Sequence, residues 1–181
     1  MPGHTEPILG AENVAEVLTN FRDAIDWILE TTLAGMNAGK TIDALASEIR
    51  LPEKYASLPY LGEHYGCTEW TVRAIYTAYL GWFDGNPTSL HPLAPETRAQ
   101  KMLALAGGRE KMLAAARAAL DEQDYQWCLE LCDLLLADAE DVQTLLLKAD
   151  AMERLAEQET SANGRHYYIA CAKEIREKLA R

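Results

Sequence analysis

The sequence predicts an all-α protein built from antiparallel helical hairpins, and three observations lead to this fold class. Apolar residues recur every three or four positions through most of the 181 residues, a spacing that gathers them on one face of a helix. Capping residues, prolines and glycines mark where these periodic stretches begin and end. No stretch shows the strict alternation of apolar and polar residues that is typical of a half-buried strand.

The first expected helix runs from Ala11 to about Met36. Its charged side chains fall on other faces than its apolar ones, and Gly35 and Gly39 loosen its end. The pattern therefore predicts a long amphipathic helix. Its apolar stripe consists of Val14, Val17, Leu18, Phe21, Ile25, Ile28, Leu29, Leu33 and Met36.

A short second helix and a longer third helix follow. Thr41 is expected to cap the short one, because a threonine hydroxyl can accept a hydrogen bond from a free N–H of the first turn. Two prolines then break the chain, so residues 51–66 are expected to be irregular. The third helix is expected from about Thr68 to Leu80.

A loop rich in proline and glycine separates the two halves of the chain. It begins with Gly81-Trp82-Phe83-Asp84-Gly85-Asn86-Pro87, in which Asp-Gly and Asn-Pro are turn-forming pairs. Pro95 suits the first position of the next helix, which is expected to end at Gly107-Gly108. We therefore expect one helical region at residues 11–93 and a second at residues 94–181.

Beyond this loop the pattern predicts two helical hairpins. Residues 110–122 and 125–137 form the first, and residues 141–159 and 163–180 form the second. Very short turns join the helices of each pair, and short connections force neighbouring helices to be antiparallel.

These hairpins are similar to tetratricopeptide repeats, whose period is about 34 residues. Further along, the match at this offset fails, because Cys132 would meet His166. The chain therefore holds one good unit and one degenerate unit, fewer than a free-standing solenoid needs. The matching pairs are Met112 with Leu146, Leu113 with Leu147, and Ala115 with Ala149.

Charge and hydropathy exclude several classes of partner. The chain has 17 Lys and Arg against 28 Asp and Glu, a net charge of −11, and its pI is near 4.8. Such a chain repels phosphate, so we expect no nucleic acid and no anionic membrane among its partners. No apolar run approaches the ~20 residues that span a bilayer, and the first residues lack the features of a signal peptide.

The four cysteines are too few for a disulfide framework. Cys128 and Cys132 are four residues apart in an apolar stretch, so both fall on one helix face as small apolar residues. We therefore expect reduced cysteines in a core.

A search for catalytic motifs finds no Gly-rich phosphate loop, no nucleophile with a suitably spaced base, and no His-x-x-x-His pair. His4 lies in a turn, Pro2-Gly3-His4, but one imidazole cannot hold zinc by itself. Arg73, Tyr76 and Tyr79 fall close together on the third helix and offer a site for a sulfate or carboxylate. The alternative is an aromatic interface in which Arg73 pairs with a glutamate.

Several stretches resemble the region that follows the catalytic domain in the alkyl sulfatases of the metallo-β-lactamase fold. The most specific is the block from Arg73 through Tyr79-Leu80-Gly81-Trp82-Phe83-Asp84-Gly85-Asn86-Pro87, with Leu90-His91-Pro92-Leu93 after it. The resemblance covers essentially the whole chain. The other stretches are Phe21-Arg22-Asp23-Ala24-Ile25, Gly35-Met36-Asn37-Ala38-Gly39-Lys40, Ile49-Arg50-Leu51-Pro52, Tyr65-Gly66 and Asp124-Tyr125-Gln126-Trp127.

In that family this region is a helical dimerisation domain with tetratricopeptide-like hairpins. The resemblance implies that the chain forms a homodimer or associates with a separate catalytic chain. It implies that residues 1–10 are the remnant of a metallo-β-lactamase-fold catalytic domain, with His4 as a zinc ligand once it is joined to the rest of the site. It also implies that Arg73, Tyr76 or Tyr79 helps to shape the substrate pocket.

The sequence departs from the family in one decisive respect. The main metal-binding signature, Thr-His-x-His-x-Asp-His with two further acidic ligands, is absent, and so is the sterol-carrier-like domain of the full enzymes. A binuclear zinc site activates water only when its ligand set is present. We therefore expect no bound cofactor and no hydrolysis from this chain alone.

Two functions remain as hypotheses. The preferred one is the dimerisation domain of a zinc-dependent hydrolase that acts on alkyl sulfate esters. The alternative is a stand-alone tetratricopeptide-like module that binds a protein partner through a groove on residues 110–180. We expect a cytoplasmic chain if it is complete, and a periplasmic one if it belongs to an exported longer enzyme.

Overall fold

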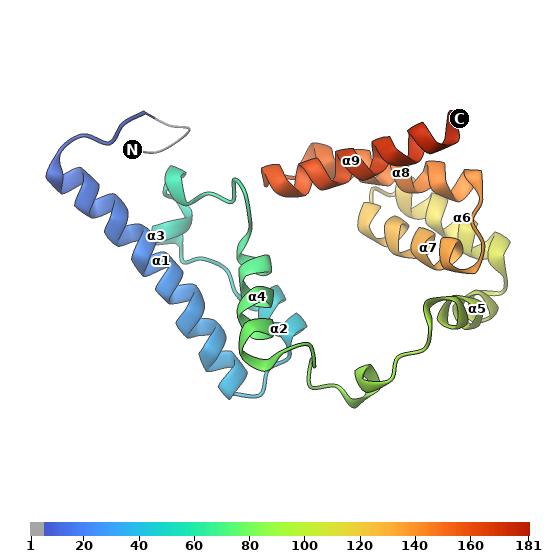
Figure 1. The fold of residues 1–181 in the computed structure, drawn as a ribbon, viewed down its shortest axis with the longest axis horizontal. Helices are drawn as coiled ribbons and strands as arrows, with labels where there is room; N and C mark the ends of the chain where they lie inside the picture. Colours follow the sequence, from blue (N-terminus) through green and yellow to red (C-terminus); the bar gives the residue numbers. More distant parts are fainter. Residues whose placement is uncertain (1–5) are drawn as a thin grey trace. The chain divides into compact units, whose positions relative to one another are not determined.

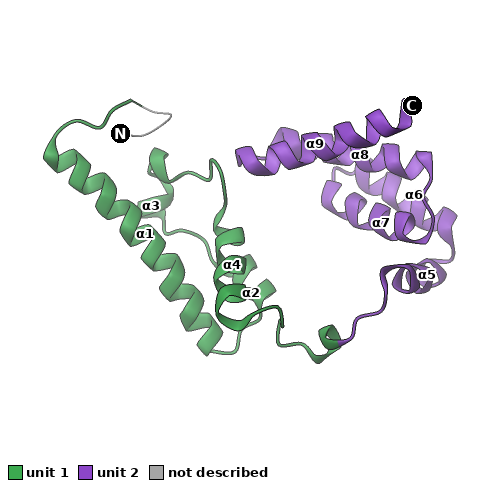
Figure 2. Cartoon of the chain, in the orientation of Figure 1, with its two compact units in different colours: residues 1–90 green, residues 91–181 purple. Residues whose placement is uncertain are grey.

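The structure is a computed structural model that describes residues 6–181. Within this range every regular element is a helix, which confirms the predicted all-α class. The chain divides into two compact units, one ending at Leu90 and the other beginning at His91 (Figure 2). Each unit has its own hydrophobic core and is described by itself.

The first unit is built around one long helix, α1 (Figure 1). The helix runs over the predicted range, and the Thr41 hydroxyl caps the next helix by accepting a hydrogen bond from the Ala44 N–H at 3.3 Å. The elements of this unit are α1 (Ala11–Asn37), α2 (Ile42–Glu48), α3 (Glu53–Ala56), the 3₁₀ helix η1 (Pro59–Leu61), α4 (Thr68–Leu80) and the 3₁₀ helix η2 (Pro87–Leu90).

The core of this unit lies between α2, α4 and the second half of α1. Leu45 and Val72 are almost fully buried there. Gly35 of α1 packs directly on Leu45, so that a Cβ at this position would overlap the leucine side chain. The buried cluster consists of Ile28, Leu45, Ala46, Ile49, Val72 and Tyr76.

The second unit is a stack of five helices. Neighbours in the chain pack on each other: α6 on α7, α7 on α8, and α8 on α9. Asp124, Asp141 and Ser161 each cap the helix that follows, through side-chain oxygens that accept backbone N–H groups. The helices are α5 (Pro95–Ala106), α6 (Arg109–Asp121), α7 (Tyr125–Asp138), α8 (Val142–Gln158) and α9 (Ala162–Leu179).

The predicted helix boundaries in both units agree with the structure to within about two residues. The main difference concerns residues 51–66, which were expected to be irregular and contain α3 and η1. Both short helices begin beside a proline, Pro52 or Pro59, whose fixed φ suits a helical first turn. The tetratricopeptide likeness of the second unit stays a prediction.

Candidate association surfaces

The described residues form exposed apolar surfaces and open hollows. One exposed apolar surface lies on the first half of α1. No residue from Ala11 to Asp23 is buried, although this segment carries large apolar side chains. Leu18 and Ile25 are 63% and 61% exposed. An amphipathic helix keeps such a face only when something covers it, because apolar surface in water is unfavourable.

An open hollow of about 210 Å³ marks the place where the core of the first unit stops covering α1. Phe21 and Ile25 line one side of it, and Tyr60 of η1 and Thr71 of α4 line the other. The Phe21 and Tyr60 rings lie 5.6 Å apart, and the Asn20 amide donates to the Tyr60 hydroxyl at 2.8 Å. These two contacts fix the rim of the hollow against the middle of α1.

A second apolar patch lies at the end of α4, within the block that carries the family resemblance. Tyr79, Leu80 and Trp82 are all exposed, and Trp82 most of all, at 74%. The chain reverses at Gly81, whose φ of 76° favours glycine. The indole packs edge-on against Phe83, with ring centroids 5.8 Å apart. The patch therefore presents aromatic side chains in a fixed orientation.

Asp84 holds the loop after this patch. Its carboxylate accepts hydrogen bonds from the Ser89 hydroxyl at 2.7 Å and from the Asn86 N–H at 2.8 Å. These bonds favour the charged form, the one from Ser89 most, and lower the pKa of Asp84 below its ordinary value. Asp84 therefore orders the loop.

The second unit has a hollow of about 430 Å³ between α5 and α7. Trp127, 45% exposed, lies on its wall with Met102 and Leu134. Arg98 and Glu130 supply opposite charges at the same wall. The hollow could hold an apolar side chain from a partner with a polar group beside it.

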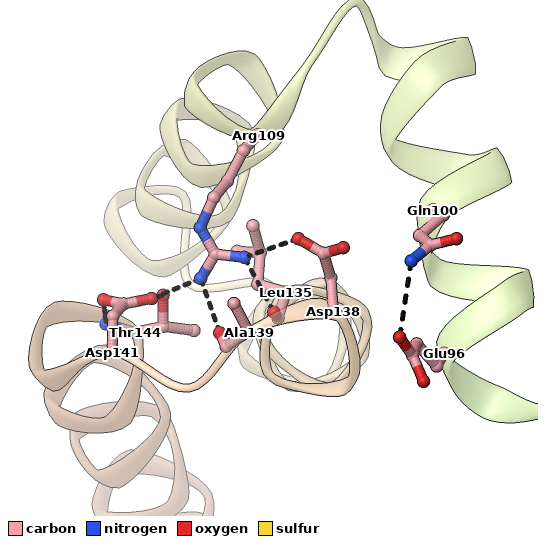
Figure 3. A network of polar contacts seen from close by, with 8 residues as sticks. All are labelled: Glu96, Gln100, Arg109, Leu135, Asp138, Ala139, Asp141 and Thr144. Carbon is pink, nitrogen blue, oxygen red and sulfur yellow. Dashed lines mark hydrogen bonds and ion pairs between the residues drawn. The ribbon is translucent and has the colours of Figure 1, made fainter.

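Arg109 is the centre of a polar network that ties α6 to the α7–α8 turn (Figure 3). Its guanidinium donates to the carbonyl oxygens of Leu135 and Ala139, each at 2.8 Å, and pairs with Asp138 and Asp141. All its partners belong to its own unit, so the network is a structural clamp.

Asp141 both caps α8 and pairs with Arg109. Partial burial works to raise the pKa of its carboxyl, but hydrogen bonds from Thr144 and the Arg109 guanidinium outweigh burial, so the net effect lowers the pKa. The clamp is therefore expected to weaken in acid.

The three residues predicted to shape a substrate pocket lie in different environments. Arg73 is held by two carboxylates, with Asp43 at 2.7 Å and Glu69 at 3.1 Å, which agrees with the alternative of an arginine paired to a glutamate. Tyr76 is buried in the core of the first unit, whereas Tyr79 is 61% exposed. One helix carries all three residues, but none of them lines either of the two hollows described above. Their role in an intact enzyme stays a prediction.

No metal site is found among residues 6–181, where no three His, Cys, Asp or Glu side chains gather to hold an ion. His4 lies outside the described residues. Cys128 and Cys132 are free and fully buried, as expected. The hydrogen bond to Cys128, together with burial, raises the pKa of Cys132. No helix in the described range is long and apolar enough to cross a bilayer.

Sequence reasoning missed two of these features. It did not show that Val14, Leu18, Phe21 and Ile25 of the α1 stripe are exposed. A single sequence does not reveal this, because exposed and buried apolar faces have the same periodicity. It also missed the Arg109 clamp, which joins residues 26 to 32 positions apart and leaves no local signal.

Comparisons with known proteins bear on what these surfaces do. The family model described as "Alkyl sulfatase dimerisation" matches residues 41–178. The linear primary-alkylsulfatase of Pseudomonas sp. (strain ATCC 19151) is 40% identical over 99% of this chain and 34% of that protein. The Alkyl/aryl-sulfatase BDS1 of Saccharomyces cerevisiae (strain S288c) is 32% identical over 96% of this chain and 27% of that protein.

A solved structure agrees with these findings. The stereoselective inverting sec-alkylsulfatase Pisa1 from Pseudomonas sp. superposes with a TM-score of 0.89 and 35% identity, over 96% of this chain and 28% of that chain. The comparisons confirm the resemblance seen in the sequence. The chain spans between 27% and 34% of the length of the relatives described here.

Proposed function

The chain belongs to the alkyl sulfatase dimerisation family, and we propose that it pairs with a second copy to join the subunits of a metal-dependent alkyl sulfatase. The intact enzyme would hydrolyse sulfate esters, and this chain would supply subunit contacts and no complete catalytic site. The observation that carries the proposal is the family match over residues 41–178, which includes just over half of the first unit and nearly all of the second.

The aromatic patch at the end of α4 supports pairing. Trp82 and Tyr79 are large side chains with apolar bodies and polar tips, a composition that is enriched at protein interfaces. The Asp84 hydrogen bonds order the loop in advance, so association costs less conformational entropy. We assign Trp82 to the centre of the contact.

Catalysis would depend on residues outside the described range. In the intact enzyme a zinc ion would supply a Lewis acid and an activated water. The described residues do not form a set that fits it, so no catalytic step is assigned to them. His4 would contribute one ligand when joined to the rest of the site. Arg73 and Tyr79 would border the substrate pocket, and buried Tyr76 would hold α4 in position.

The test is the mass of the purified chain in solution, measured by light scattering over a wide concentration range. We expect twice the 20.1 kDa of the single chain. Trp82→Glu is expected to shift the chain towards monomer, because it places a charge in the contact. Trp127→Glu, on the second unit, is the matched control and is expected to leave the mass unchanged. A chain that stays monomeric at high concentration would contradict the proposal.

A second candidate function is a tetratricopeptide-like module that binds a protein partner. The hollow beside Trp127 favours it, because it combines an exposed indole with charges of both signs. An immunoblot of the source organism separates the two functions. A native band at 20.1 kDa would favour the binding module. A band several times heavier would favour the intact metallohydrolase.

A further inference from the structure

The α1 helix carries one apolar seam with two different environments. Its members follow alternating steps of four and three residues, the heptad spacing that suits a long helix–helix contact. In the second half of α1 the seam is covered, with Ile28 in the core and Gly35 against Leu45. In the first half Val14, Leu18 and Ile25 are exposed, and Phe21, 38% exposed, contacts the Tyr60 ring. The seam consists of Val14, Leu18, Phe21, Ile25, Ile28, Thr32 and Gly35.

The uncovered half of the seam is shaped for a partner. Ala15 and Val17 flank it, so no acidic group interrupts the face. The hollow between Phe21, Ile25 and Tyr60 continues the seam at the point where the covered half begins. A helix with no buried residue over its first turns gains little from its own unit and is marginal in water. A partner that covers this face would order it.

The family comparisons separate α1 from the rest of the chain. The dimerisation model begins at residue 41, after α1 has ended at Asn37. The similarity to the Pseudomonas alkylsulfatase nevertheless covers 99% of the chain, so α1 is shared with that enzyme. The chain matches only 34% of that enzyme, which leaves about two thirds of its length to supply a partner surface. A helix shared with the enzyme but outside the dimerisation model is suited to contact that remaining part.

Charge disfavours the other occupant, the same helix of a second copy. α1 carries five acidic side chains and one basic one. Two such helices laid side by side would repel each other over distances of about one Debye length, which is roughly 8 Å at physiological salt. A partner groove with basic residues along its edges would instead attract the acidic outer positions of α1.

We infer that the first half of α1 is a docking helix for the catalytic part of an alkyl sulfatase polypeptide, and that it takes no part in pairing two copies of this chain. The inference rests on the proposed function, because it assumes that the chain belongs beside such a catalytic part. The docking helix would connect the catalytic part to the dimerising region through one continuous seam.

Co-expression tests the docking. The tagged chain is produced with the part of the Pseudomonas sp. (strain ATCC 19151) linear primary-alkylsulfatase that it does not match. Circular dichroism and gel filtration first show that this part is folded, and the amount that co-purifies is then measured. The double variant Leu18→Glu with Ile25→Glu is expected to capture at least about tenfold less of the catalytic part than the wild type does. Its matched control is Leu105→Glu with Ile169→Glu, two exposed apolar positions of the second unit, which is expected to capture as the wild type does. Circular dichroism checks that both variants remain helical.

The mass of each variant without the partner gives the second readout. The Leu18→Glu, Ile25→Glu variant is expected to stay a dimer, and hydrogen exchange in residues 14–25 is expected to be the same in monomer and dimer. A monomeric variant, or slower exchange of this segment on pairing, would show that α1 is a dimer contact and would overturn the inference. Failure of the wild type to capture the catalytic part, or unchanged capture by the variant, would overturn it too. A wild-type chain that is itself monomeric would instead refute the proposed function.

Discussion

The two units bury their apolar residues to different extents. The second unit has a continuous core that runs from Leu103 to Ala172, and all its helices contribute to it. The first unit has a small core between α2, α4 and the second half of α1. Large side chains on the first half of α1, such as Leu18, remain exposed. The difference teaches that one unit is stabilised by its own packing, whereas the other is built to be completed by a partner.

The largest expected effect tests the core of the second unit. Leu135→Ala removes a fully buried side chain from the last turn of α7 and should lower the free energy of unfolding by about 2–5 kcal/mol. Leu18→Ala, the same substitution at an exposed position of α1, should change it by no more than about 0.5 kcal/mol. Urea unfolding followed by circular dichroism measures both. If both substitutions lowered the free energy of unfolding by the same amount, the contrast between the units would be refuted.

The next effect concerns the polar clamp of the second unit. Arg109→Met removes the guanidinium that bonds two carbonyl oxygens and two carboxylates. It should lower the free energy of unfolding by about 1.5–3 kcal/mol. Arg154→Met is the control, because Arg154 pairs with Glu157 on the surface, and it should lower the free energy of unfolding by less than Arg109→Met does. Thermal unfolding of the two variants provides the comparison. If Arg109→Met lowered the stability less than Arg154→Met, the clamp would not be needed for the stability of the second unit.

A smaller effect tests how tightly the core of the first unit is packed. Gly35→Ala places a methyl group into the Leu45 side chain and should destabilise by about 1–3 kcal/mol if the leucine cannot move aside. Gly66→Ala is the control, since nothing lies within 4 Å of a Cβ built there. The urea midpoint of each variant measures the effect. A neutral Gly35→Ala would mean that the core of the first unit has room to rearrange.

The smallest effect is a dependence of the second unit on pH. The pKa of Asp141 is lowered in the folded chain, so its contribution to stability is present above the unfolded value near 4 and is lost as the pH falls through the lower folded value. Unfolding between pH 5 and about pH 2 should show this loss. Asp141→Asn should make the free energy of unfolding depend less on pH. Glu157→Gln, on the exposed face of α8, should leave this pH dependence as in the wild type. An unaltered profile in Asp141→Asn would contradict the assignment.

Much of the fold was predictable because helix signals are local. Thr41, Pro95 and Gly107 act within one turn of the helix that they start or end, so their positions in the sequence were enough to place those boundaries. The candidate site was less predictable. Arg73, Tyr76 and Tyr79 are close on a helix, but the core takes Tyr76 and leaves Tyr79 in solvent. Sequence spacing gives the face of a helix and does not give what covers that face.

The sequence by itself determined the helical class, the helix ends and the family to which the chain belongs. It did so because periodicity, capping and the Gly81–Pro87 block depend on residues that are near one another in the chain. Only the tertiary structure decided that the α1 seam is covered in one half and open in the other, and that Arg109 clamps the α7–α8 turn. Both depend on contacts between residues far apart in sequence, whose formation depends on how whole helices pack.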